Sequence, residues 1–190
     1  MAGGNVIIVH RFSGSSKSDW YQWLKKALES KGFKAEILKM PSPEKHSIDE
    51  CVSALEVSVL DISNTYFVGH GIGCQVILHF LARENLGRAK GALLVSPPLH
   101  LKESALKSPN GKRIQNEWLS RPLDFEAVKA NVESIRIIAS KDDPYISDGD
   151  AKELAQKLGA FLNTMPLRSH FTAEDGYAEL HAALNEFMKM

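Results

Sequence analysis

Short runs of aliphatic and β-branched residues alternate with longer amphipathic stretches along the chain. The short runs predict six strands, at Asn5 to Val9, Ala35 to Leu38, Thr65 to Val68, Gly91 to Val95, Ile135 to Ala139 and Phe161 to Pro166. The stretches predict six helices, at Ser18 to Lys31, Ile48 to Leu60, Ile72 to Glu84, Phe125 to Ala130, Asp150 to Leu158 and Tyr177 to Met188. Ser18 or Asp19 is expected to cap the first helix, and Gly32 to end it.

This alternation predicts one α/β domain that spans residues 1–190. Helical crossovers join parallel strands, so we expect a three-layer α/β/α sandwich around a six-stranded parallel sheet. The expected strand order is 2-1-3-4-5-6, with ligands binding where the order reverses, beyond the carboxyl ends of the strands. The segment from Ser96 to Asp124 has little pattern, which favours a functional flap over a plain connection.

Composition narrows the classes of partner. The 23 basic residues balance the 23 acidic ones, so no net charge attracts nucleic acid or an anionic membrane. The chain contains no run of eighteen apolar residues, and its N-terminus lacks the basic region of a signal peptide. We therefore expect a cytoplasmic protein whose partner is a small molecule or another protein.

The two cysteines give no sign of a metal or disulfide site. Cys51 and Cys74 both lie in apolar helical patterns and do not have the spacing of metal ligands. We expect no metal and no cofactor.

The most specific local motif is FVGHGIGC, at residues 67–74. A predicted strand leads into it and a predicted helix leads out, which is the setting of the nucleophile elbow G-x-S-x-G. The centre of the motif is Gly71, so the serine hydroxyl is missing. Positive φ at such a turn costs most residues about 1–3 kcal/mol and costs glycine almost nothing.

Two further motifs follow predicted strands and complete a familiar order. Asp143 lies in SKDDPYIS, and His170 lies in RSHF. Nucleophile, acid and histidine is the order of catalytic residues along the chain of α/β-hydrolases.

The whole chain resembles the small, nearly lidless serine hydrolases typified by retinoblastoma-binding protein nine. The resemblance begins in VIIVHRFSGSSKSDWYQWLKKAL, continues through MPSP and the glycine-centred elbow, and includes RPLDFEAVKAN, SKDDPYIS and SHF. It implies an α/β-hydrolase fold with little or no lid and an ancestral activity on carboxylic esters or amides.

The resemblance also implies roles for individual residues. The family's acid falls on Asp143, its histidine on His170 and its nucleophilic serine on Gly71. The backbone N–H groups of Phe12 and Ile72 would form the oxyanion hole. Without its nucleophile, such a triad is expected to be weakly active or inactive.

Two residues that neighbour the assigned site positions, Asp142 and Arg11, are interpreted separately. Asp142 precedes the acid and is expected to face solvent, although it is an alternative acid. The family usually has a small residue or glycine where Arg11 stands, and we interpret Arg11 as a solvated residue at the rim of the pocket.

Substitute nucleophiles are disfavoured. The Cys74 side chain should point at a neighbouring strand, away from His170. Three loop serines, Ser13, Ser15 and Ser16, lack the fixed geometry that nucleophilic attack needs. A phosphate-binding glycine loop is also disfavoured, because the dinucleotide motif G-x-G-x-x-G follows the first strand.

Two alternatives to a weakly active hydrolase stay open. One is a non-catalytic pseudoenzyme that binds an ester- or amide-like small molecule or a protein partner. The other is an active serine esterase that carries an engineered Ser-to-Gly substitution at position 71.

Overall fold

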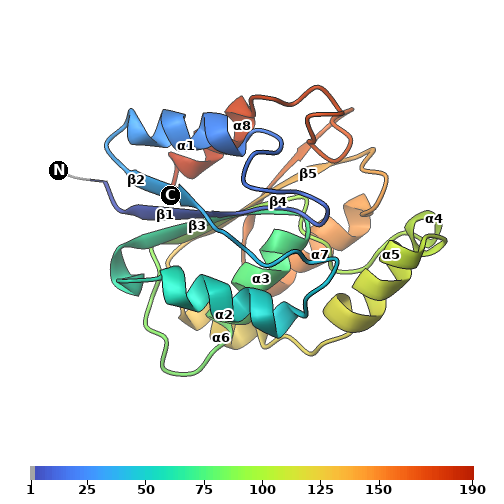
Figure 1. The fold of residues 1–190 in the computed structure, drawn as a ribbon, viewed down its shortest axis with the longest axis horizontal. Coiled ribbons are helices and arrows are strands. Elements are labelled where there is room, and N and C mark those ends of the chain that lie inside the picture. The colour runs from blue at the N-terminus through green and yellow to red at the C-terminus, as the bar shows by residue number, and fades with distance from the viewer. Residues whose placement is uncertain (1–2) are drawn as a thin grey trace.

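The structure is a computed structural model that describes residues 3–190, and its centre is a parallel sheet (Figure 1). Every neighbouring pair of strands is parallel, and the order is β2-β1-β3-β4-β5-β6. This confirms the predicted strand order and the α/β class. The strands are β1 (Asn5–Val9), β2 (Lys34–Ile37), β3 (Thr65–His70), β4 (Gly91–Val95), β5 (Ile135–Ser140) and β6 (Phe161–Met165).

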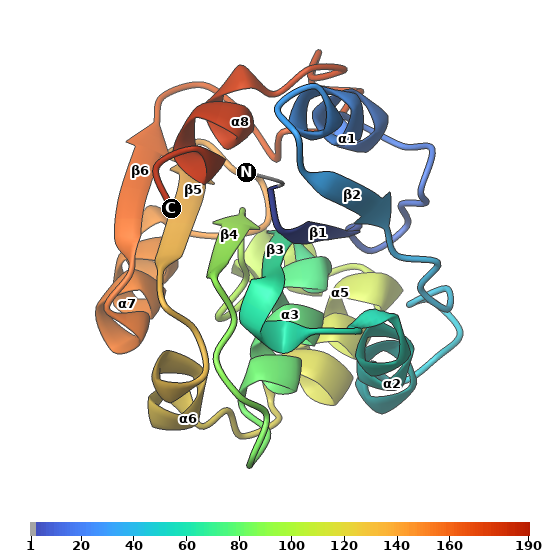
Figure 2. The same cartoon turned by 90° about the vertical axis from the view of Figure 1, so that its left-hand side faces the viewer.

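Helices cover both faces of the sheet (Figure 2). Two helices, α1 and α8, lie on one face, and α2, α3, α6 and α7 lie on the other. The helices are α1 (Tyr21–Glu29), α2 (Ile48–Ser58), α3 (Ile72–Leu81), α4 (Glu103–Leu106), α5 (Pro109–Arg113), α6 (Phe125–Ala130), α7 (Asp148–Leu158) and α8 (His181–Phe187). Two short helical turns, η1 (Ile62–Asn64) and η2 (Ile114–Leu119), complete the secondary structure.

The apolar runs form strands because both faces of the sheet are buried. In β1, Val6 and Ile8 belong to the core under α1 and α8, whereas Ile7 and Val9 belong to the core under α2 and α3. All five residues of β4 are buried. Continuous apolar runs are typical of parallel strands that helices cover on both sides, and the three-layer prediction is therefore correct.

The predicted start of the first helix is wrong. The helix α1 begins at Tyr21, and Trp20 occupies the N-cap position without a capping side-chain hydrogen bond. Asp19 has a φ of 51°, and its carboxylate accepts hydrogen bonds from Arg11 and from the backbone N–H of Ala173. Asp19 does not cap the helix because these distant groups occupy its oxygens.

The boundaries of the last two helices also differ from the prediction. The helix α7 begins at Asp148, since the Ser147 hydroxyl caps it by accepting the N–H of Asp150. The helix α8 begins at His181, four residues later than predicted. Before it, Leu180 is buried and the Tyr177 ring lies 5.7 Å from Phe171, so the apolar spacing there reflects a packed loop.

The segment from Ser96 to Asp124 is more ordered than the sequence indicated. It contains α4, α5 and η2, and α5 starts at Pro109 after a cap in which the Ser108 hydroxyl accepts the N–H of Gly111. Trp118 is fully buried and anchors the end of this segment in the core cluster to which the apolar residues of α3 also belong. These elements are too short to show a helical period, which is why the prediction of an irregular segment was wrong.

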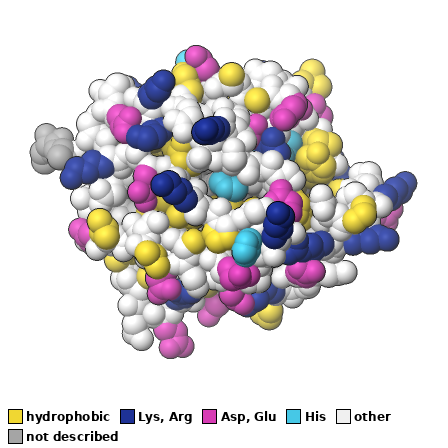
Figure 3. Space-filling view, in the orientation of Figure 1, with side chains coloured by type: hydrophobic (Ala, Val, Ile, Leu, Met, Phe, Trp, Pro, Cys, Tyr) yellow, Lys and Arg dark blue, Asp and Glu magenta, His cyan; other side chains and the backbone are white. Residues whose placement is uncertain are grey.

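The surface is of mixed charge, in keeping with the balanced composition. On the face shown in Figure 3, basic and acidic side chains are interspersed rather than gathered by sign. Within residues 3–190, each helix falls short of the length and apolarity that a bilayer-crossing helix requires.

The helix α3 lies very close to the backbone of β1. A Cβ atom at Gly73 would lie 2.4 Å from the Val9 carbonyl oxygen and 2.6 Å from that of His10. Backbone atoms of a central strand cannot move aside cheaply, so glycine is required at this contact.

We predict that Gly73→Ala lowers the free energy of unfolding by about 3 kcal/mol, because the added methyl group overlaps the β1 backbone. Gly149→Ala is the matched control, since its Cβ would lie 3.6 Å from the nearest atom, in the first turn of α7. This control should leave stability unchanged or raise it by up to about 1 kcal/mol. Urea denaturation of both variants measures the difference, and equal effects would contradict the packing argument.

Candidate active site

Loops at the carboxyl end of the sheet bring the predicted acid and histidine together. Asp143 follows β5 and His170 follows β6, and the Nδ1 atom of His170 lies 2.8 Å from Oδ2 of Asp143. The exposed fractions of the two residues are 2% and 9%. The pair is therefore a largely buried, well-formed hydrogen bond.

The Asp143 carboxylate is fixed by its own loop. Its second oxygen, Oδ1, accepts the backbone N–H groups of Tyr145 at 2.9 Å and Ile146 at 3.1 Å. Because the carboxylate acts as acceptor, Nδ1 of His170 is the donor and Nε2 is left with a free lone pair.

Asp142 is exposed, as expected, but it has a structural contact. Its Oδ1 accepts the Ser140 hydroxyl and the backbone N–H groups of Arg168 and Ser169. It therefore holds the beginning of the loop that carries His170, while Asp143 contacts the imidazole.

Gly71 occupies the sharp turn between β3 and α3. Its φ is 53° and its ψ is −122°, a backbone conformation that favours glycine. A Cβ atom built on Gly71 would lie 3.1 Å from Nε2 of His170. The structure thus brings Gly71, His170 and Asp143 together in one row.

The Phe12 and Ile72 amides lie beside this row. Both residues line the same cavity as Gly71 and His170. Ile72 is the first residue of α3, so its N–H has no partner in the preceding turn. Among the hydrogen bonds within residues 3–190, neither amide serves as a donor.

The alternative nucleophiles are placed differently. Cys74 is buried, its thiol lies 3.5 Å from the Val95 carbonyl oxygen, and burial raises the pKa of this thiol. Ser13 lines the cavity with a φ of 57°, whereas Ser15 is hydrogen-bonded to Ser18 in the exposed loop.

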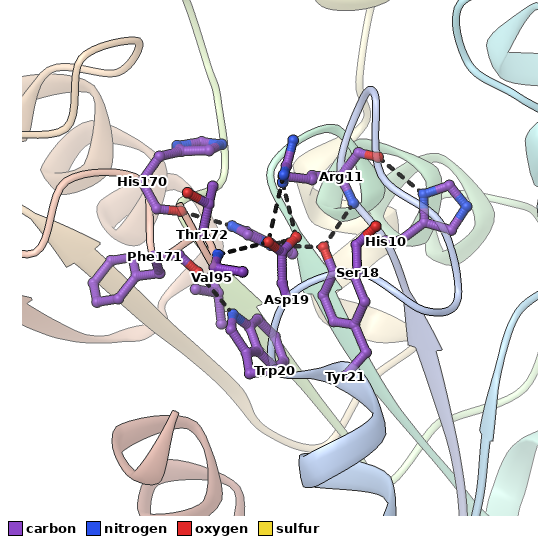
Figure 4. A network of polar contacts seen from close by, with 12 residues as sticks. His10, Arg11, Ser18, Asp19, Trp20, Tyr21, Val95, His170, Phe171 and Thr172 are labelled. Carbon is purple, nitrogen blue, oxygen red and sulfur yellow. Dashed lines mark hydrogen bonds and ion pairs between the residues drawn. The ribbon is translucent and has the colours of Figure 1, made fainter. Parts of the chain in front are cut away.

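Arg11 lines the cavity, as interpreted, but it is not solvated, and that part of the interpretation was wrong. Its side chain is 16% exposed, and its Nε donates to Oδ2 of Asp19 at 2.8 Å (Figure 4). A second guanidinium nitrogen donates to Glu174, and a third donates to the carbonyl of Phe12. Arg11 therefore connects the loop after β1 with the loop that carries His170.

This ion pair sets the charge state of a buried carboxylate. Burial opposes ionisation of Asp19, whose side chain is 1% exposed, but the hydrogen bonds from Arg11 and the Ala173 N–H and the nearby positive charge together outweigh burial and lower the pKa of Asp19. The guanidinium is thereby committed to protein carboxylates, so it is poorly disposed to bind an anionic ligand.

A buried chain of hydrogen bonds holds the backbone carbonyl of His170 in place (Figure 4). Nε2 of His70 lies 2.8 Å from the His170 carbonyl, and Nδ1 of His70 lies 2.8 Å from the Tyr21 hydroxyl. A carbonyl only accepts, so His70 donates from Nε2 and accepts the Tyr21 hydroxyl at Nδ1. Tyr21 in turn accepts the backbone N–H of Arg11.

His70 remains neutral in this arrangement. Burial, together with the nearby His170, lowers the pKa of His70 well below its usual range. The 3.9 Å separation between Nδ1 of His70 and Asp19 is therefore not an ion pair, although it lies within ion-pair distance.

This support for His170 was not identified from the sequence. The Trp20 indole also takes part, since its N–H donates to the Phe171 carbonyl at 3.0 Å. The available signal was the pair of polar aromatic residues Trp20 and Tyr21, because their polar atoms usually find partners when they are buried.

A cavity of about 260 Å³ lies over Gly71 and His170. Part of its wall comes from the segment that contains α4 and α5. The apolar residues of the wall are Phe12, Ile72, Pro98, Leu101, Ala105, Ile114, Tyr145 and Ile146. Such a pocket fits a small, mainly apolar group next to the imidazole.

Lys102 joins the segment that lines the cavity to the loop that carries Asp143. Its ammonium group donates to the Asp143 carbonyl at 2.5 Å, and its backbone N–H donates to the Tyr145 carbonyl at 2.8 Å. The short helices over the cavity are thus joined directly to the loop that orients His170.

Comparison with known proteins identifies relatives along nearly the whole chain. The serine hydrolase family matches residues 6–189. YdeN of Bacillus subtilis is 30% identical over 176 residues, which are 92% of this chain and 90% of YdeN. Serine hydrolase RBBP9 of Rattus norvegicus is 28% identical over 170 residues, which are 89% of this chain and 82% of RBBP9.

Solved structures agree with the fold. The crystal structure of the B. subtilis ydeN gene product has a TM-score of 0.86 at 28% identity, covering 98% of this chain and 97% of that one. Est1E of Butyrivibrio proteoclasticus, solved with ferulic acid, has a TM-score of 0.72 at 14% identity, covering 99% and 89%. The second likeness shows a shared fold only.

We predict that buried His70 makes the protein less stable in mild acid. Its folded pKa lies below the unfolded value of about 6.5, so its contribution to stability is complete above that pH and is lost as the pH falls. His70→Gln should flatten the dependence of the unfolding free energy on pH below 6.5 by up to about 1.4 kcal/mol per pH unit.

Urea denaturation at several pH values between 6.5 and 4.5 measures this slope. The exposed histidine control, His181→Gln, should keep the wild-type slope. An unchanged slope in the His70 variant would show that this histidine takes up a proton in the folded protein.

Proposed function

Since the chain belongs to the serine hydrolase family, we propose that it binds a small carboxylic ester, amide or related acyl compound beside Gly71. The observation that carries this proposal is the distance of 3.1 Å between a Cβ atom at Gly71 and Nε2 of His170. The acceptor of the imidazole is aimed at the position where the family carries its nucleophile.

In this proposal each retained group keeps its role toward the ligand. Asp143 fixes the ring of His170 and its tautomer. The Phe12 and Ile72 amides hold the carbonyl oxygen of the ligand, and Gly71 is a nucleophile elbow that lacks its nucleophile. The apolar wall receives the acyl group.

The missing hydroxyl limits the chemistry. An acyl-enzyme at position 71 requires an oxygen that glycine lacks, so the covalent route of the family is closed there. Binding and the oxyanion hole alone accelerate hydrolysis roughly 10³- to 10⁴-fold over water, far less than an intact triad. We propose a pseudoenzyme with respect to covalent catalysis, in which ligand binding dominates.

We predict that a fluorophosphonate probe does not label the protein, because no hydroxyl is held against His170. Intact-protein mass spectrometry after incubation with the probe measures this. Stoichiometric labelling that peptide mapping assigns to Ser13 or Cys74 would reveal a substitute nucleophile and contradict the proposal.

We predict that Gly71→Ser restores labelling and speeds the hydrolysis of p-nitrophenyl butyrate, because the added hydroxyl meets Nε2 of His170. The same variant should lose about 1 kcal/mol of stability through positive-φ strain and the close approach to His170. Gly71→Ala is the matched control, since it carries the same strain without a hydroxyl and should remain unlabelled. A folded but inert serine variant would disprove the assigned roles of Asp143 and His170.

A further inference from the structure

The free lone pair of His170 opens onto the cavity. Its Nδ1 is engaged by Asp143, and Nε2 forms no hydrogen bond with another group of residues 3–190. His170 and Gly71 both line the cavity, so ligand and solvent reach this nitrogen beside the glycine.

Glycine leaves room for a water molecule at this position. The hydroxymethyl group of a serine side chain and a water molecule have similar volumes, on the order of 30 Å³. The space that a serine side chain would enter opens onto the cavity, so a water oxygen in contact with the Gly71 Cα atom can approach Nε2 of His170 to hydrogen-bond distance. Phe12 and Ile72, whose amides would hold a carbonyl oxygen, line the same cavity.

We infer that the Asp143–His170 pair activates this water directly, and that the protein slowly hydrolyses activated esters and thioesters by direct attack of water on the carbonyl carbon. This inference rests on the proposed function, because it requires an acyl ligand in the cavity. It adds an activity that needs no protein nucleophile and forms no acyl-enzyme.

The step balances without any further reactant. Water gives a proton to Nε2 of His170 while its oxygen bonds to the carbonyl carbon, and the displaced electron pair moves to the carbonyl oxygen. The Phe12 and Ile72 amides stabilise that oxyanion. When this electron pair re-forms the carbonyl double bond, the bond to the leaving oxygen or sulfur breaks. The leaving atom takes the proton from Nε2, and the products are an acid and an alcohol or thiol.

The geometry also restricts the substrate. Water competes poorly with a fixed serine oxygen, so the leaving group must depart easily, as phenolates and thiolates do, and amides are excluded. The cavity of about 260 Å³ is smaller than most ligand pockets. Leu101, Ala105 and Ile114 make its wall apolar, which favours a short uncharged acyl chain.

The first experiment follows p-nitrophenyl butyrate, with the substrate in excess over a high concentration of protein, by absorbance and by mass spectrometry after acid quench. The wild-type protein should release p-nitrophenol without a burst and without an acylated species. His170→Gln should lower the rate about 100-fold or more, because general-base assistance is worth that much. Exposed His46 offers the control, and His46→Gln should keep the rate.

Substitutions at position 71 distinguish attack by water from attack by a nucleophile of the protein. Gly71→Ala should also lower the rate at least tenfold, because its methyl group displaces the water, whereas Gly71→Ser should show a burst and an acylated serine. Thermal denaturation of both variants checks that they are folded and equally strained. An acyl adduct on Ser13 in the wild-type protein would overturn the inference.

A binding measurement distinguishes this inference from the proposed function. The hydrate of 1,1,1-trifluoro-2-hexanone resembles the species formed when water adds to a carbonyl, and ¹⁹F NMR reports its binding. We expect the wild-type protein to bind the hydrate and Gly71→Ser to form a covalent hemiketal. Binding without His170-dependent turnover would overturn the inference and leave the proposed function intact, while absence of both would overturn both.

Discussion

The turn at Gly71 is the constraint on which the site depends. The chain passes from a buried strand to a buried helix through one residue with positive φ, and both backbone groups of that residue are engaged. Its N–H donates to the Val95 carbonyl, and its carbonyl accepts the N–H of Cys74. The turn is thereby fixed to β4 and to α3, while α3 lies against β1 at Gly73. The position of residue 71 relative to the sheet cannot shift without unpacking the core.

The loop of His170 has no regular structure, yet it is held as firmly as the turn. Leu167, Ser169 and Phe171 all have φ near +50°, a conformation that costs residues other than glycine about 1–3 kcal/mol each. Such strain persists only where surrounding contacts determine the backbone. Here the carbonyls of His170 and Phe171 accept hydrogen bonds from buried His70 and Trp20. The strain is balanced by a network that reaches back to Arg11 and the first loop.

The sequence predicted what depends on local pattern and missed what depends on distant partners. The apolar runs predicted all six strands, because burial on both faces of a parallel sheet leaves a continuous signal. The strand order came from the rules for crossover connections, and the structure confirms it. The role of Arg11 in joining two loops was missed because one of its partners, Glu174, lies 163 residues away. Asp19 was misread as a cap because one of its donors, the Ala173 N–H, is also distant in the sequence. The pairing of Asp143 with His170 came from the family resemblance, since neither residue type nor spacing alone singles it out.

The distribution of backbone strain around the site indicates the effect of a glycine at position 71. Serine at this turn would carry a penalty that glycine avoids, so the glycine relaxes one strained position. The residues on either side of His170, Ser169 and Phe171, keep a positive φ, and the side chains of Arg11 and Asp19 form a largely buried ion pair. Hydrogen bonds from His70 and Trp20 to the carbonyls of His170 and Phe171 hold these positions in place, so the imidazole keeps its orientation beside Gly71 although glycine supplies no hydroxyl there.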